Sequence, residues 1–446
     1  MRIAVIGAGV VGVCTTWELA DDGHDVHCFD RHDSVAAQSS FAHTGLLGTL
    51  APSFMPPPRH GATTALKEWR WLRAHRRSGR TTTPADLQAL HQLGAASRQH
   101  LDHLCRRLDI QIERSQGTLV LLHDAAQLDE AAARLPTWQQ AGLTARLVDA
   151  EACQALEPGL GGDPQTRDRP LELAGGLHLP DEGAGNCRQF AQQLRDRAER
   201  QHGAQFHFGI SVQQLASSGG RPLLTLHRPA DRPATEALAG DAPDRHAPGP
   251  APFADTATLP RTWQEDFDAV VLCTGASGGL TARMPQTLPL RAVWGHTITF
   301  RLHPQGLPIR SAVVDAQTGV TITRLGDRLR VAGTHRLTPA DATPPAAGDA
   351  ALQALYQAVE RWFPSAIQRA DSQVWTGARA CLPGPLPTIG ASAQAGIWLN
   401  MGHGGAGWAL ACGSARRLAD LVAASATSAT PVTATAPLVA TDRMNA

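Results

Sequence analysis

Runs of hydrophobic and polar residues divide the first part of the chain into recognisable elements. The apolar run over residues 2–6 predicts a buried parallel strand, and the stretch after it, to about Ala20, predicts a helix. Residues 25–30 predict a second strand. A strand, a helix and a strand in this order are typical of a βαβ unit. The sequence therefore predicts an α/β protein that begins with a parallel sheet.

The same periodicities continue through the middle of the chain. Helices are predicted over 84–109, 124–142 and 186–204, and strands over 117–123 and 205–209. Each predicted helix has a polar face and apolar residues at helical spacing, which is typical of a helix that packs against a core.

The pattern changes in the second half of the chain. Residues 217–265 are rich in Pro, Ala, Asp, Gly and Arg, and predict a long surface insertion, partly disordered. Residues 268–276 predict an apolar strand that ends in a glycine turn, and residues 293–335 predict short strands of an antiparallel sheet. Helices are expected over 351–363 and from the glycine-rich stretch near residue 407 to about residue 424.

Composition narrows the class of protein. With 446 residues, 43% of them hydrophobic, the chain is long enough for two or three domains. The 40 basic and 40 acidic residues balance, which argues against nucleic acid as the main partner. No apolar run is long enough to span a membrane, and the eight cysteines are scattered, so a reducing cytoplasm is expected. No histidine or cysteine spacing predicts a metal site.

A glycine-rich turn between the first strand and the first helix points to a nucleotide. Gly7, Gly9 and Gly12 have G-x-G-x-x-G spacing, and Asp30 ends the next strand. This arrangement predicts a dinucleotide whose pyrophosphate lies at the helix N-terminus and whose ribose binds Asp30. The motif fits NAD and FAD alike, but the polar segment 31–47 favours the longer FAD.

Several segments, in a fixed order, resemble one family. They include VIGAGVVGVCTTWEL, QSSFAHTGLL, GGLHLPDEGAGNCRQFAQQL, WTGARACLPGPLPTIG and LNMGHGGAGWALACGSARRLADL. The chain resembles the D-amino acid dehydrogenase branch of the FAD-dependent D-amino acid oxidase-like superfamily. The resemblance implies a glutathione-reductase-like Rossmann FAD-binding domain and a substrate domain with a mixed or antiparallel sheet. It implies these limits: FAD-binding domain 1–55, 175–290 and 370–424; substrate domain 56–174 and 291–369; tail 425–446.

The resemblance also implies a reaction. Hydride passes from Cα of a D-amino acid, or of a cyclic imino acid such as a D-proline derivative, to flavin N5. The imine then hydrolyses to a 2-oxo acid and ammonia, and the electrons pass to a quinone or another acceptor. Two alternatives stay open: an oxygen-using amine oxidase of the glycine or sarcosine type, and a non-catalytic flavoprotein subunit of a complex.

Matching segments give the residues their expected roles. Arg379 is expected to bind the substrate carboxylate, and His296 and His335 to line the catalytic pocket. A second glycine-rich turn is expected to approach the flavin N1–C2=O edge, where reduction places negative charge. The expected cofactor contacts are Gly7, Gly9, Val10, Val11, Gly12, Asp30, Arg31, His32, Ser39, Ser40, His43, Thr44, Gly45, Leu46, Val212, Thr274, Gly275, Gly402, Gly404, Gly405, Ala406 and Gly407.

A basic and aromatic stretch, residues 65–77, has two interpretations. It contains Trp69, Trp71 and a series of arginines. One interpretation is a helix that lies on the inner face of the membrane, as a quinone-linked enzyme would need. The other is a solvated helix whose tryptophans pack inward.

Overall fold

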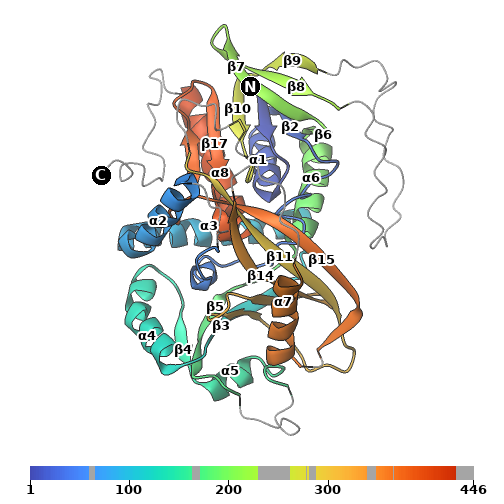
Figure 1. Ribbon diagram of the computed structural model, residues 1–446. Coiled ribbons are helices and arrows are strands. Elements are labelled where there is room, and N and C mark those ends of the chain that lie inside the picture. Colours follow the sequence, from blue (N-terminus) through green and yellow to red (C-terminus); the bar gives the residue numbers. More distant parts are fainter. Residues whose placement is uncertain are drawn as a thin grey trace.

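Two large sheets organise the molecule. The computed structural model describes residues 1–59, 66–162, 171–229, 262–277, 279–280, 288–338, 348–364 and 366–427. Figure 1 shows a six-stranded sheet in the upper half of the molecule and a larger sheet in the lower half. Within the described ranges, no helix is long and apolar enough to cross a lipid bilayer.

The six-stranded sheet has the order β16-β17-β10-β1-β2-β6, parallel except at β16. Helices α1, α3, α6 and α8 bury their apolar faces in a core with one face of this sheet. The strands are β1 (Arg2–Ile6), β2 (Asp25–Asp30), β6 (Gln205–Phe208), β10 (Ala269–Leu272), β16 (Thr388–Ala391) and β17 (Ile397–Met401). The helices are α1 (Val10–Asp21), α3 (Pro84–Leu108), α6 (Cys187–His202) and α8 (Gly407–Thr427).

The eight-stranded sheet has the order β15-β11-β14-β13-β12-β3-β5-β4. It is mixed rather than purely antiparallel, because β12 pairs in parallel with β3. Its strands are β3 (Ser115–Leu122), β4 (Arg146–Val148), β5 (Gly175–Ala184), β11 (Arg291–Leu302), β12 (Ala312–Asp315), β13 (Thr321–Leu325), β14 (Arg328–Thr338) and β15 (Ile367–Cys381). The remaining helices are η1 (Ala51–Phe54), α2 (Leu66–Thr81), α4 (Ala125–Gln140), α5 (Ala150–Leu156), α7 (Asp349–Trp362) and η4 (Gly404–Ala406).

Local signals in the sequence explain where the helices begin and end. Thr83 and Asp86 form a capping box at the start of α3. Asn186 caps α6, and Gly203 ends it in the left-handed conformation. These signals lie within a few residues of each end, and the predicted bounds of α3, α4, α6 and α7 agree with the structure to within two residues.

The prediction for residues 217–265 needs correction at both ends. Strands β7 (Ser211–Ser218), β8 (Arg221–His227) and β9 (Thr262–Asp266) form a three-stranded antiparallel sheet. Leu224 and Leu226 alternate with outward residues and are fully buried. The prediction followed the composition of this segment and missed the alternation of buried and outward residues in β8. The rest of the predicted insertion, residues 230–261, lies outside the described residues, as does the predicted tail beyond Thr427.

Strand pairing also bears on the predicted domain limits. Strand β5 and most of β15 were assigned to the FAD-binding domain by the limits at residues 175 and 370, yet both strands pair within the eight-stranded sheet. Each strand leads directly into the other half of the molecule. The division into two domains stays a prediction.

Candidate functional site

The first glycine turn is tightly packed between β1, α1 and β10. Gly7 has a φ of +107°, and a Cβ added there would lie 2.5 Å from the carbonyl oxygen of Cys273. A Cβ on Gly12 would lie 1.7 Å from the carbonyl oxygen of Gly7. Side chains are therefore excluded at both positions. The N-cap of α1 is Gly9, which contributes no side chain, so the backbone is open to a ligand on that side.

The carboxylate of Asp30 lies beside this turn. Its Oδ2 accepts a hydrogen bond from the Ala8 amide at 2.7 Å, and its Oδ1 accepts one from the His32 amide at 2.8 Å. These contacts fix the carboxylate at the carboxyl end of β2, where ligands bind in open α/β sheets. Nearby, the Ser40 hydroxyl accepts a hydrogen bond from the Val10 amide at 3.1 Å.

A cavity of about 510 Å³ opens at this end of the six-stranded sheet. It has the size of a small-molecule site. The predicted residues that line it are Gly7, Gly9, Asp30, Arg31, His32, Ser39, Ser40, Val212, Thr274 and Gly275. They come from four separate segments of the chain, and the fold brings them together. Their roles toward the cofactor remain predictions.

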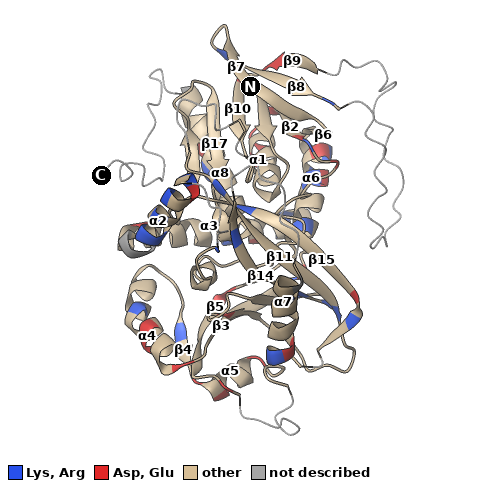
Figure 2. Ribbon diagram, in the orientation of Figure 1, with Lys and Arg blue, Asp and Glu red and all other residues tan. Residues whose placement is uncertain are grey.

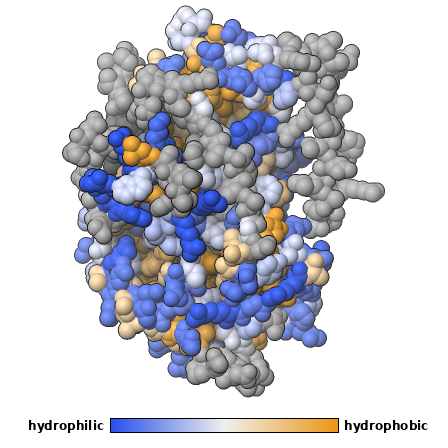
Figure 3. All heavy atoms as spheres, viewed as in Figure 1, coloured by the Kyte–Doolittle hydropathy of each residue, from blue (hydrophilic) through white to orange (hydrophobic). Residues whose placement is uncertain are grey.

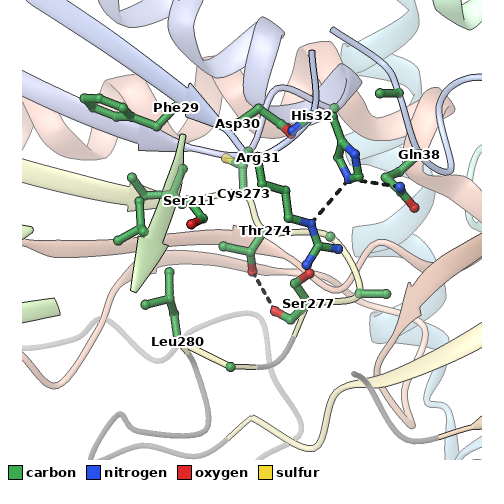
Figure 4. Close-up of a pocket in the computed structure, with 18 of the residues that line it drawn as sticks. Phe29, Asp30, Arg31, His32, Gln38, Ser211, Cys273, Thr274, Ser277 and Leu280 are labelled. Carbon is green, nitrogen blue, oxygen red and sulfur yellow. Dashed lines mark hydrogen bonds between the residues drawn. The ribbon is translucent and has the colours of Figure 1, made fainter. Parts of the chain in front are cut away.

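Other lining residues escaped the sequence prediction. Figure 4 shows Phe29, Gln38, Ser211, Ser277 and Leu280 around the same cavity. Gln38 Nε2 lies 2.9 Å from His32 Nε2, and the Thr274 hydroxyl donates to the Ser277 carbonyl at 3.1 Å. Most of these residues neighbour predicted ones in the chain, which is the signal that could have found them. Trp294 and Ala378, on the paired strands β11 and β15, also line the cavity and carry no such signal.

The segment that contains His43, Thr44, Gly45 and Leu46 is bound to the eight-stranded sheet. The carbonyl of His43 accepts from Arg330 Nη1 at 2.9 Å, and Thr323 donates to the carbonyl of Thr44. Gly45 has a φ of +91°. The side chain of Leu46 belongs to a buried apolar cluster, and its backbone forms a bridge to Ala184.

The second glycine turn lies at the end of β15. An isolated bridge joins Cys381, the last residue of that strand, to His403. Gly402 and Gly404 have φ angles of +84° and +57°, and α8 begins at Gly407. His403 Nε2 lies 3.1 Å from the Ser414 hydroxyl, and burial lowers the pKa of its ring to about 4. The ring is therefore neutral and buried, and Gly404, Gly405 and Gly407 are the partly exposed residues of the turn.

Arg379 lies on β15, two residues before Cys381. Its Nη1 donates to Met55 Sδ at 3.4 Å, and among the described residues no carboxylate forms an ion pair with it. Burial lowers the pKa of its guanidinium from the ordinary value, yet an arginine at this depth stays charged. A partly buried cation without a carboxylate is costly unless an anion joins it.

The predicted histidines divide into two kinds. Burial and the nearby Arg379 lower the pKa of His43 and of His335 to about 3, so both rings are neutral. The His335 Nε2 is buried, and no hydrogen-bond partner for it exists among the described residues. His296 instead contacts the Thr376 hydroxyl at 2.9 Å, and burial lowers its pKa. Arg379 thus contributes to the lowered pKa of His43 and His335, whereas burial accounts for that of His296.

The fold and the glycine turn define a dinucleotide-binding α/β protein. The chain belongs to the FAD dependent oxidoreductase family, DAO, whose model matches residues 2–421. It is therefore an FAD-dependent oxidoreductase.

Comparison with individual proteins gives similar relatives and similar solved structures. A D-amino acid dehydrogenase from Cereibacter sphaeroides is 33% identical over 448 residues, 95% of this chain and 92% of the relative. One from Chromohalobacter salexigens is 29% identical, covering 97% and 98%. Among solved structures, glycine oxidase from Geobacillus kaustophilus has a TM-score of 0.68 at 20% identity, with 95% of each chain covered. L-proline dehydrogenase from P. horikoshii has a TM-score of 0.65 at 15% identity, covering 94% and 92%. The structural likenesses show the fold.

Proposed function

We propose that the protein oxidises D-amino acids, or a cyclic imino acid such as a D-proline derivative, to the imine. The observation that carries the proposal is Arg379, a partly buried guanidinium with no ion pair to a described carboxylate, at the end of a strand joined to the second glycine turn. An α-carboxylate is the anion that such a fork binds in a bidentate manner. The curated relatives named above are D-amino acid dehydrogenases, which supports this substrate class.

The residues around the cavity fit FAD. Gly7 and Gly12 leave no room for a Cβ, and Gly9 adds no side chain at the N-cap of α1, where backbone amides would bind a pyrophosphate. Asp30 would bind the adenosine ribose, and Arg31, His32 and Val212 would surround the adenine. When bound, FAD supplies the two-electron acceptor for the hydride.

The second glycine turn would stabilise the reduced cofactor. The short helix η4 and the start of α8 place backbone amides at the same end of the helix, with no acidic residue in the first turn of α8. A helix N-terminus stabilises negative charge without a lysine or arginine. We assign Gly404, Gly405, Ala406 and Gly407 to the pyrimidine edge of the flavin.

Arg379 and the two neutral histidines are the side chains proposed to contact the substrate. The guanidinium would orient the carboxylate, so that Cα is held in one position. His43 and His335 are neutral, so Arg379 is the charged group of the three and the one that would attract the carboxylate. The uncharged Nε2 of His335 can accept a hydrogen bond from the substrate amine once that amine is neutral.

The side chains of helix α2 support the proposal of an electron acceptor at a membrane surface. Trp71 is only 3% exposed and donates from Nε1 to the Pro289 carbonyl, whereas Trp69 is 54% and Leu66 67% exposed. Trp71 thus packs inward, whereas Trp69 stays exposed and available to a membrane surface. Figure 2 shows mostly basic colouring along α2, and Figure 3 shows a hydrophobic spot among hydrophilic side chains at that margin.

The charges of α2 are one-sided. Glu68 is buried and pairs with Arg291 at 3.3 Å. The exposed cations form no ion pair with a described carboxylate; they are Lys67, Arg70, Arg73, Arg76 and Arg77. We propose that this face lies on anionic lipid at the inner face of the membrane, close to a quinone or another electron acceptor.

One experiment tests the reaction. The purified holoenzyme is mixed with D- and L-amino acids, N-methyl amino acids and prolines under argon, and flavin absorbance is followed. D-amino acids are expected to bleach the flavin, and a quinone or dye is expected to restore its absorbance. In air, the enzyme is expected to release little peroxide. Bleaching by no compound, or peroxide release at the turnover rate, would contradict the proposal and favour a non-catalytic flavoprotein or an oxidase.

A further inference from the structure

Met55 lies between the proposed carboxylate anchor and the second glycine turn. Its Sδ is 3.4 Å from Arg379 Nη1, and a Cβ added to Gly405 would lie 4.0 Å from the same sulfur. A ligand carboxylate on Arg379 would therefore place its Cα and side chain beside this thioether. A thioether is polarizable and flexible, so it packs against apolar groups of varied shape.

The loop that carries Met55 is fixed on both sides. Before it, Phe54 packs edge-on against Trp138, with ring centroids 5.8 Å apart. After it, the Arg59 amide donates to the His335 carbonyl at 2.6 Å. Met55 is thus held at a set place on the eight-stranded sheet rather than on a free loop.

A buried carboxylate holds the start of this loop. Glu182 Oε1 accepts hydrogen bonds from the Thr49 and Leu50 amides, both at 2.9 Å. Glu182 is 4% exposed, and burial raises its pKa. Its other oxygen lies so close to Gly48 that an added Cβ there would be 1.9 Å away. A carboxylate so deeply buried is costly, and it positions two amides that begin the turn into η1.

We propose that Met55 is the specificity-determining residue that packs against the side chain of the bound D-amino acid, and that Glu182 is the positioning residue that keeps Met55 there. The inference rests on the proposed role of Arg379 as carboxylate anchor. It predicts a preference for uncharged side chains that fit the space left by a methionine.

Substitution of Met55 tests the first part. Met55→Ala should raise the ratio of kcat/KM for D-phenylalanine to that for D-alanine by about tenfold or more, because the pocket gains the volume of several methylenes. Met55→Leu conserves volume and should leave the ratio within about threefold. Calorimetric binding of 3-phenylpropanoate and propanoate, which cannot be oxidised, should show the same shift in the ratio of Kd values.

Substitution of Glu182 tests the second part. Glu182→Ala should move both ratios in the direction of Met55→Ala, while Glu182→Gln keeps an acceptor oxygen and should restore them. Glu182→Asp, which withdraws the oxygens by one methylene, serves if the alanine variant does not fold. Glu157 is the matched control, since it is fully buried and accepts from the Arg310 and Ser311 amides of a different loop. Glu157→Ala should leave both ratios unchanged.

The outcomes separate this inference from the proposed function. Ratios within twofold of wild type in Met55→Ala would overturn the role of Met55, and equal shifts in the Glu182 and Glu157 variants would overturn that of Glu182. If no D-amino acid bleaches the flavin, the proposed function fails, yet the calorimetric ratio still decides whether Met55 borders the carboxylate site.

Discussion

Arg379 shows how one side chain can carry a functional argument. It is charged, partly buried and without an ion pair among the described residues, while the neighbouring histidines are held neutral by burial and by its own charge. Some guanidinium groups of the chain form ion pairs, as Arg416 does with Asp22 and Glu18. Others donate to the backbone, as the buried Arg330 does to the His43 carbonyl. Arg379 instead donates to the Met55 thioether, and we propose that a ligand carboxylate supplies its anion.

Removing this guanidinium should weaken substrate binding selectively. A charge-assisted bidentate contact is worth about 1.5–3 kcal/mol, so Arg379→Ala should raise KM by about 10- to 150-fold with FAD still bound. Steady-state kinetics and flavin absorbance measure the two effects. Arg369 lies on the same strand and pairs with Glu360, so Arg369→Ala is the control and should leave KM unchanged. An unchanged KM in Arg379→Ala would remove this residue from the site.

At the scale of elements, the strand–turn–helix at the N-terminus lines the cavity. Gly7 and Gly12 are needed for the turn itself, because a Cβ at either would overlap backbone. Gly9 differs from both: a Cβ there would lie 3.6 Å from the Ser40 hydroxyl, which is an ordinary contact. The fold tolerates a side chain at Gly9, but an approaching pyrophosphate would not.

Gly9→Ala should therefore separate folding from cofactor binding. We expect the apoprotein to keep its circular dichroism spectrum and melting temperature, while the Kd for FAD rises by about tenfold or more, since close backbone approach is lost. Fluorescence quenching of added FAD measures the Kd. Gly348→Ala, at a position with open space around it, is the control. FAD binding as tight as in the wild type would show that the pyrophosphate lies elsewhere.

Helix α2 should bind anionic lipid through its unpaired cations. Each basic residue near such a surface contributes about 1 kcal/mol, so Arg73→Glu with Arg77→Glu should weaken binding to phosphatidylglycerol vesicles by about tenfold or more. Vesicle sedimentation at low and high salt measures this. The double variant Arg106→Glu and Arg200→Glu reverses two exposed charges on other helices and should bind as the wild type does. Equal losses in both variants would show that only net charge matters.

At the scale of the whole molecule, buried histidines couple stability to pH. Burial lowers the pKa of five described histidines to about 3 or 4; they are His43, His91, His207, His335 and His403. In the unfolded chain these histidines bind protons near pH 6.5. In the folded chain they bind protons only near pH 3 or 4. The stability they contribute is therefore complete above about pH 6.5 and is lost as pH falls toward 4.

The free energy of unfolding should accordingly decrease between pH 7 and pH 5. Each pKa unit is worth about 1.4 kcal/mol, so His335→Gln should reduce this decrease by about 1–2 kcal/mol. Urea titrations at the two pH values measure it. His303→Gln alters an exposed histidine and should leave the decrease unchanged. An identical decrease in His335→Gln and wild type would mean that the ring is not buried in solution.

The sequence by itself determined the elements whose causes are local. The glycine turn of residues 7–12, Asp30 at the end of β2, and the caps of α3 and α6 all depend on residues within about 30 positions, so spacing alone predicts them. The resemblance of ordered segments added the family and Arg379. Composition gave a wrong prediction for β8, where buried residues such as Leu224 and Leu226 alternate with outward residues.

Only the tertiary structure decided which groups meet across the two sheets. Met55 and Arg379 are 324 positions apart, and Glu182 holds amides more than 130 positions before it. Packing between distant segments decides whether a carboxylate lies beside Arg379. It also decides whether Trp69 or Trp71 is buried. No local sequence pattern predicts either result. Short motifs therefore predict the glycine turn and Asp30, whereas the contacts proposed to set selectivity are long-range and form only when the chain is folded.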